Sequence, residues 1–203
     1  MWEESTPEPV LKIEDTERSF DFWLNRPFIP ATLRGQLSRA NVLLVPTEGY
    51  RDFDGPVFPE GTEQLLDYLR NDCPDGASVD ICIDDDEYRE LVIHDAIVVI
   101  SSMIVSSVVC PLIVNRIQRY LDRRRSSDQT HVKVRITEVE GGKAREITYE
   151  GPFAGFEPTL RPILGSGSSS AADAEPTKDA LESGTTDPDA DGSDPGSTAT
   201  CRR

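Results

Sequence analysis

The acidic C-terminal stretch contains a spacing that matches a known ligand-binding loop. Asp187, Asp189, Asp191 and Gly192 reproduce the opening D-x-D-x-D-G of a calcium loop, in which oxygens at positions 1, 3 and 5 chelate the ion. Position 12 is Thr198 rather than a bidentate Glu, and no helical pattern flanks the loop. We therefore predict no metal site here.

The cysteines and histidines are the next candidates for chemistry. The chain has four cysteines and two histidines, namely Cys73, Cys82, Cys110, Cys201, His94 and His131. The cysteines lie too far apart for a C-x-x-C metal or redox pair, and neither histidine has a Ser or Cys at a catalytic spacing. Cys73 and Cys82 would form a disulfide if this part were extracellular, whereas a reducing compartment would keep them as thiols.

Acidic side chains occur in two further places that could bind or catalyse. Residues 84–87 form an Asp-Asp-Asp-Glu run, which we interpret as the charged tip of a hairpin. The Gly- and Pro-rich loop 46–61 mixes Glu48, Asp52 and Asp54 with aromatic residues, a surface typical of partner recognition. Carboxylates alone do not indicate acid–base catalysis, so we predict a protein that is not an enzyme and has no cofactor. A ligand pocket lined by this loop would reverse that prediction.

Charge restricts the partners. The formal net charge of −16 disfavours nucleic acid, because phosphate binding needs clustered Lys and Arg. Arginine is abundant, as expected for a high-GC or salt-adapted prokaryotic source. Five arginines follow the most apolar segment, namely Arg116, Arg119, Arg123, Arg124 and Arg125.

That apolar segment, residues 96–114, has 19 consecutive residues without a charge, 14 of them apolar. As a helix it would be about 28 Å long, close to the roughly 30 Å hydrocarbon core of a bilayer. We therefore predict a single transmembrane helix, with the basic side in the cytoplasm by the positive-inside rule, where the arginines would also meet anionic lipid. Because Met1 to Glu8 has no apolar run, translocation would depend on this internal segment.

A soluble protein is the alternative interpretation of the same segment. Predicted strands on both sides of it favour a buried core or oligomer helix of a soluble α+β domain, since two hairpins of one sheet cannot lie on opposite sides of a membrane. Ser102, Ser106 and Cys110 fall at i, i+4 and i+8 of the expected helix. This stripe of small residues would let helices pack closely in a homo-oligomer, or serine is simply tolerated there.

The remaining segments predict a small mixed sheet. Residues 41–45 indicate a buried strand, and Thr62 is a plausible N-cap for a short helix. Residues 78–83 and 88–93 predict one hairpin, and 132–149, with Gly141 and Gly142 at its turn, a second. The expected divisions are a polar arm with an aromatic island (1–40), a small α/β segment (41–95), the apolar helix (96–114), a basic juxtamembrane segment (115–130), a hairpin region (131–164) and a disordered acidic tail (165–203).

The layout of residues 91–150 resembles the effector-associated constant components of bacterial conflict systems. The resemblance is carried by the succession of the expected apolar helix, the Arg-Arg-Arg run at 123–125 and the hairpin sequence from Val132 to Tyr149. It implies a non-enzymatic adaptor beside an effector. From sequence we thus expect an α+β single-pass membrane protein with an anchoring or interaction role, or alternatively a soluble adaptor of this kind, with a protein partner in either case.

Overall fold

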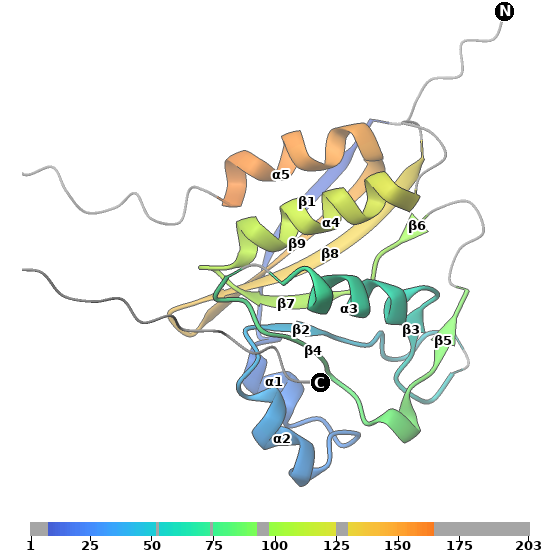
Figure 1. Cartoon of the computed structure of the whole chain (residues 1–203), viewed down its shortest axis with the longest axis vertical. Helices are drawn as coiled ribbons and strands as arrows, with labels where there is room; N and C mark the ends of the chain where they lie inside the picture. The colour runs from blue at the N-terminus through green and yellow to red at the C-terminus, as the bar shows by residue number, and fades with distance from the viewer. Residues whose placement is uncertain (1–7, 52, 74, 93–97, 125–129, 165–203) are drawn as a thin grey trace, which may run out of the picture. The chain divides into compact units, whose positions relative to one another are not determined.

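The computed structural model describes residues 8–51, 53–73, 75–92, 98–124 and 130–164 (Figure 1). The calcium-like motif, the predicted acidic tail, His94, Cys201 and Arg125 lie outside these described residues. The strands are β1 (Val10–Thr16), β2 (Val42–Leu44), β3 (Phe58–Pro59), β4 (Val79–Ile81), β5 (Glu90–Leu91), β6 (Val98–Val99), β7 (Met103–Ser106), β8 (His131–Glu140) and β9 (Lys143–Pro152). The helices are α1 (Phe20–Leu24), α2 (Ala31–Leu37), α3 (Thr62–Asn71), α4 (Cys110–Arg124) and α5 (Phe156–Leu164), with 3-10 turns at Asp85–Glu87 and Phe153–Gly155.

The main sheet is mixed and has the strand order β1-β9-β8-β7-β2-β4, with β6 also paired to β8. Neighbours β1, β9 and β8 run antiparallel, whereas β8 with β7 and β2 with β4 run parallel. A separate pair, β3 and β5, runs parallel. The α+β class and the mixed sheet agree with the sequence prediction.

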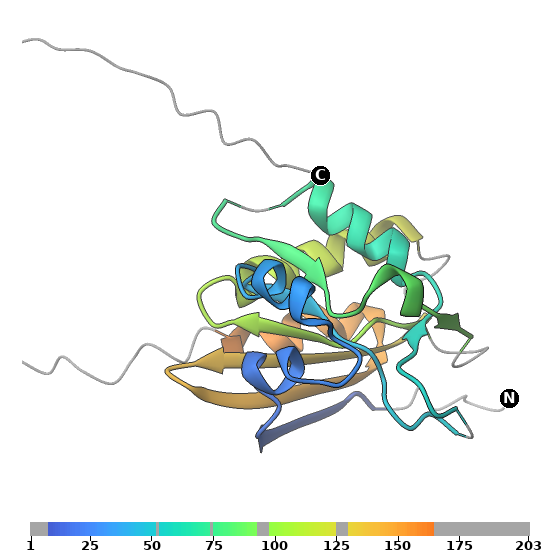
Figure 2. The same cartoon turned by 90° about the horizontal axis from the view of Figure 1, so that it is seen from below.

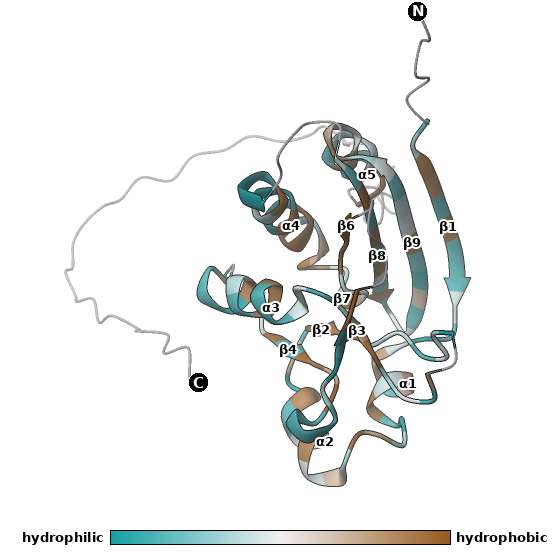
Figure 3. Ribbon diagram, turned by 90° about the vertical axis from the view of Figure 1, so that its right-hand side faces the viewer, coloured by the Kyte–Doolittle hydropathy of each residue, from teal (hydrophilic) through white to brown (hydrophobic). Residues whose placement is uncertain are grey.

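Two apolar clusters hold helices against the sheet. Helices α3, α4 and α5 lie along one side of it (Figures 1 and 3), over a core to which β2 and β7 contribute Val42, Leu44, Met103 and Val105. The alternate residues Leu43 and Ile104 point to the opposite face, where Trp23 and Leu37 come from α1 and α2. Strands β2 and β7 are therefore buried on both faces.

The second predicted hairpin is confirmed. Strands β8 and β9 pair antiparallel over their full length, ending with Glu140 opposite Lys143. The two loop residues, Gly141 and Gly142, have φ values of 56° and 81°, as a type I′ turn requires. The two glycines at the turn therefore determine that β8 pairs with β9 and in which register.

The first predicted hairpin is wrong, although both of its strands exist. Strand β4 pairs parallel with β2, and β5 pairs parallel with β3. Between them, the acidic run forms the 3-10 turn, with the Asp84 side chain accepting from the N–H of Asp86. Alternating apolar residues indicated strands here, but alternation does not specify which strand lies alongside.

The prediction of one continuous helix over 96–114 is also wrong. The described part of this segment contains β6, β7, a turn and only the first residues of α4. Met103, Ile104 and Val105 are each 0% exposed and alternate between the two cores. A strand buried on both faces is apolar at every position, so hydropathy alone cannot distinguish it from an apolar helix.

Helix α4 is amphipathic rather than apolar all round. Its buried side chains follow helical spacing and belong to Cys110, Ile113, Val114, Ile117, Tyr120 and Leu121. Across the described ranges, no helix combines the length and the hydropathy that a bilayer crossing requires.

The predicted arm 1–40 contributes regular structure. It supplies edge strand β1 and helices α1 and α2, and its aromatic island packs into the smaller core through Trp23, Phe20, Phe22 and Phe28. Helix α5 was not predicted, because Pro158 and Pro162 interrupt its sequence. Its buried residues Phe156, Leu160 and Leu164 nevertheless follow an i, i+4, i+8 pattern.

Candidate interaction surface

Strand β1 forms one edge of the main sheet and is exposed from Val10 to Asp15, whereas Thr16 is half-buried. It pairs with β9 on one side, and among the described strands none pairs with its other side (dark blue, Figure 2). Val10, Leu11 and Ile13 are 61%, 37% and 44% exposed. Alternate residues of an edge strand direct their N–H and C=O groups away from the sheet. The result is a seven-residue edge with apolar side chains and outward backbone groups.

Strand β9 holds β1 closely at one end because Gly151 has no side chain. A Cβ at Gly151 would lie 2.8 Å from the Cα of Pro9 and 3.2 Å from the Tyr149 hydroxyl oxygen. Gly151 follows the first register pair, Val10 with Glu150. The glycine is therefore needed for the close approach of the chain that leads into β1.

One face of β1, β9 and β8 carries a row of ion pairs. Lys12 contacts Glu14 at 2.7 Å, Lys133 contacts Glu150 at 2.6 Å, and the third pair is Arg135 with Glu146 at 3.4 Å. The first pair lies on β1 itself, with 63% and 54% of its side chains exposed. These charges make this face of the three strands polar, and they give β1 one cation and one anion on that face.

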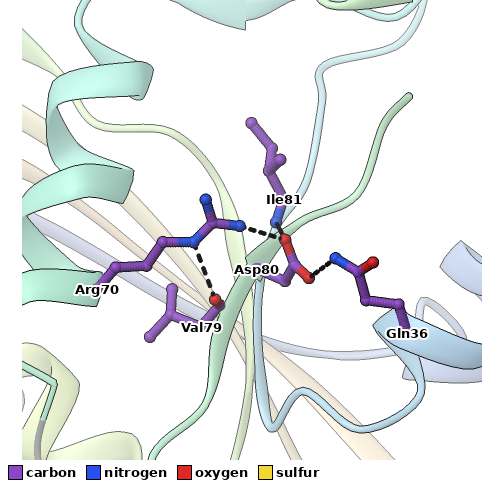
Figure 4. Close-up of polar contacts among 5 residues, drawn as sticks. All are labelled: Gln36, Arg70, Val79, Asp80 and Ile81. Atoms are coloured by element: carbon purple, nitrogen blue, oxygen red, sulfur yellow. Dashed lines mark hydrogen bonds and ion pairs between the residues drawn. The ribbon is translucent and has the colours of Figure 1, made fainter. Parts of the chain in front are cut away.

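The opposite edge of the sheet, β4, is covered by side chains (Figure 4). Arg70 of α3 donates from Nε to the carbonyl oxygen of Val79 at 3.4 Å and from Nη2 to Asp80 at 2.6 Å. Asp80 also accepts from the Ile81 N–H at 2.9 Å and from Gln36 of α2 at 2.9 Å. Backbone groups of Val79 and Ile81 that an added strand would need are thus already bonded.

The predicted basic residues pack helix α4 against α3. Arg116 forms an ion pair with Asp72, and Arg123 lies over the Tyr68 ring at 5.0 Å. Arg124 bonds the Tyr120 hydroxyl at 2.5 Å and lies over the same ring. Arg119 is exposed on the same helix.

The predicted helix-packing stripe does not form a stripe. Ser102 precedes β7, Ser106 ends it, and Cys110 begins α4. Only Cys110 is fully buried, and it belongs to the larger core.

Two of the described thiols, Cys82 and Cys110, are buried and have raised pKa values, which lowers their reactivity. Burial, followed by the charges of Asp80 and Glu48, raises the pKa of Cys82 to about 12. Burial, followed by Glu138, also raises the pKa of Cys110 to about 12. Cys73 donates to the Ala77 carbonyl oxygen at 2.9 Å, and no disulfide joins it to Cys82. This arrangement matches the alternative in which both remain thiols.

Glu90 and Tyr88 form a polar cluster at the start of α3. Glu90 accepts from the N–H groups of Gly61 at 3.1 Å and Glu63 at 2.9 Å, and from the Tyr88 hydroxyl. Burial raises the pKa of Glu90, but these hydrogen bonds outweigh burial and lower it overall. Burial raises the pKa of Tyr88. The carboxylate acts as a cap for the helix, and the phenol stays protonated, so neither is poised for proton transfer.

Loop 46–61 is closed by backbone pairing of Thr47 with Val57, at 2.8 and 3.0 Å. Glu48, at its base, forms an ion pair with Arg26. Phe53 at its tip is 40% exposed. Phe58 is completely buried in the larger core, so it serves packing and not recognition.

Sequence reasoning missed both edges of the sheet. For β1, a signal was present: Leu11 and Ile13 alternate with Lys12 and Glu14 directly after Pro9. For β4, Asp80 was visible only as a polar residue within a predicted strand. Its contacts with Arg70 and Gln36 bring together residues 10 and 44 positions away, and no local pattern indicates them.

Over the described residues, the fold and this surface define a class of protein: an α+β module whose main sheet has one edge covered by side chains and one exposed edge. Comparison of the chain with protein-family models, with curated proteins and with solved structures gives no match.

Proposed function

We propose that this chain is a non-enzymatic protein-interaction module that binds a partner along the open edge of β1. The observation that carries the proposal is the contrast between the two edges, since β4 is covered by Arg70 and Asp80 while β1 is exposed over its first six residues. Natural sheets usually protect their edges, so a long exposed edge with apolar side chains is typical of a binding site.

The binding mode is addition of a strand. An extended segment of the partner would take the place next to β1, with main-chain hydrogen bonds supplying affinity. Specificity would come from side chains that alternate between the two faces. On β1 these are Leu11 and Ile13 on the helix-covered side and Lys12 and Glu14 on the charged side.

The resemblance to constant components of bacterial conflict systems supports the same class of function, an adaptor beside an effector. In the sequence that carries the resemblance, the hairpin residues form β8 and β9 and the arginines Arg123 and Arg124 end α4, whereas the expected apolar helix is absent from the described part of its segment. Membrane anchoring is not part of the proposal, because the apolar side chains of β7 pack inside the protein.

Site-specific photo-crosslinking in cells that produce the protein tests this function. A photoreactive amino acid replaces Val10 on β1, and a matched control replaces Asp67, an exposed residue on α3. We expect a discrete protein adduct from position 10 and not from position 67, with the crosslink mapped to an extended segment of the captured protein. Equal products from both positions, or none from position 10, would overturn the proposal.

A further inference from the structure

We propose that the strand taken up by β1 is β1 of a second copy of this chain, paired antiparallel about a two-fold axis. This inference rests on the proposed function, because it names the partner for the same edge. It follows from the sequence of β1, which is complementary to itself in one register.

Antiparallel pairing of β1 with its copy must keep each face of the sheet continuous. A two-fold axis perpendicular to the sheet does so, and it passes through a residue that faces its own copy. Only an axis through Ile13 pairs all seven residues, since Val10 then lies opposite Thr16 of the second copy. Moving the axis to the next residue on either side leaves residues at the ends without a partner within β1.

The same full-length register places opposite charges across from each other. Lys12 faces Glu14 of the second copy, and Glu14 faces Lys12, while Ile13 faces Ile13 and Leu11 faces Asp15. An axis through Lys12 would place lysine against lysine, and an axis through Glu14 would place glutamate against glutamate. Opposite-charge pairs stabilise antiparallel strands and like-charge pairs destabilise them.

The side chains involved are available for these contacts. Lys12 and Glu14 are 63% and 54% exposed and already contact each other along the strand at 2.7 Å. Two copies would therefore form a square of alternating charges. Ile13, 44% exposed on the other face, would be covered by its own copy. The net charge of −16 makes two copies repel each other. Salt screens this repulsion, so the pairing is expected at physiological ionic strength, where the Debye length is about 8 Å.

Reciprocal charge exchange on the full-length chain tests the partner and the register together. Lys12→Glu and Glu14→Lys each create two like-charge pairs in a homodimer, but a mixture of the two variants restores two opposite-charge pairs. The double variant K12E/E14K restores them within one chain. Sedimentation velocity from about 10 μM to about 500 μM measures the dimer, and circular dichroism checks that each variant is folded.

We expect the parent chain to dimerise, each single variant to weaken dimerisation on the order of tenfold, and both the mixture and the double variant to recover it. A parent chain that stays monomeric over this range overturns the inference. A dimer that none of the exchanges changes also overturns it, because another surface then forms the interface. A monomeric chain that is crosslinked through position 10 to a different protein would leave the proposed function standing while removing this partner.

Discussion

Gly151 determines how closely the chain entering β1 can approach β9. Its missing side chain leaves room for Pro9, whose Cα would lie 2.8 Å from a Cβ at this position. The contact is with backbone, so it cannot be relieved by rotation of a side chain. The packing of the proposed binding edge thus depends on one glycine.

Gly151→Ala is expected to loosen β1 without unfolding the sheet. The clash would lower the free energy of unfolding by about 1–3 kcal/mol, as for other overpacked sites. Trypsin should then cleave after Lys12 several-fold faster. The matched control is Gly55→Ala, where a Cβ would meet nothing within 4 Å. Equal cleavage rates for the two variants would show that the close approach is not needed.

The buried thiols should be inert in the folded protein. Because burial raises the pKa of Cys82 and Cys110 to about 12, their thiolate fraction at pH 8 is on the order of 10⁻⁴. With Cys201→Ser as background, Ellman's reagent should titrate Cys73 first and reach the other two only on addition of denaturant. Further substitution of Cys73 by Ser should remove the native reaction. Rapid modification of two or more thiols in the native state would contradict this expectation.

Helix α3 depends on a carboxylate from strand β5. Glu90 of β5 accepts from the N–H groups that begin the helix and thereby links β5 to α3. Such a cap stabilises a helix most strongly while the carboxylate is ionised, because charge-assisted hydrogen bonds are stronger and the helix dipole favours a negative charge there.

This cap predicts a loss of stability in acid. The pKa of Glu90 in the folded protein is lowered from its ordinary 4.5, so its stabilisation is present above that pH and is lost as the pH falls through the folded pKa. Glu90→Gln should lower the free energy of unfolding by about 1 kcal/mol near neutral pH and by less in acid. Urea unfolding near neutral pH and in acid measures the free energy of unfolding of each variant. Glu87→Gln, at an exposed position, is the control. An equal effect of Glu90→Gln at both pH values would contradict the cap.

How far the elements could be predicted depends on how local their causes are. The β8–β9 hairpin follows from neighbouring residues, with Gly141 and Gly142 at its turn. The parallel pairing of β2 with β4 joins Val42 to Val79, and no nearby residue specifies that choice. The apolar segment was misjudged because Met103, Ile104 and Val105 meet two different cores. Sequence therefore predicted the strands and the fold class better than it predicted which strands pair, and the proposed binding edge depends on strand pairing.

Across the main sheet, the free energy of local opening should fall from the middle strands toward β1. Strands β2 and β7 are covered on both faces, with Leu43 and Ile104 each 0% exposed, whereas β1 is exposed and paired on one side. Regions with few buried contacts open at lower free energy.

Native-state hydrogen exchange measures this gradient. In dilute protein, the amides of β1 should exchange orders of magnitude faster than those of β2 and β7. When the protein is concentrated, protection should rise in β1 and stay constant in β2. Uniform protection across the sheet would contradict the gradient, and an increase elsewhere would place the contact on another surface.

The covered edge at β4 sets a limit on assembly. In the language of polymer chemistry, a molecule with one reactive end is monofunctional: it can couple once and then has no end left to extend. Two copies joined through β1 would leave the β4 edge of each main sheet, where Arg70 and Asp80 already occupy backbone groups of Val79 and Ile81. In such a pair, a guanidinium and a carboxylate would stop further strands from adding at β4, so the assembly would stay a finite pair and not grow into a fibre.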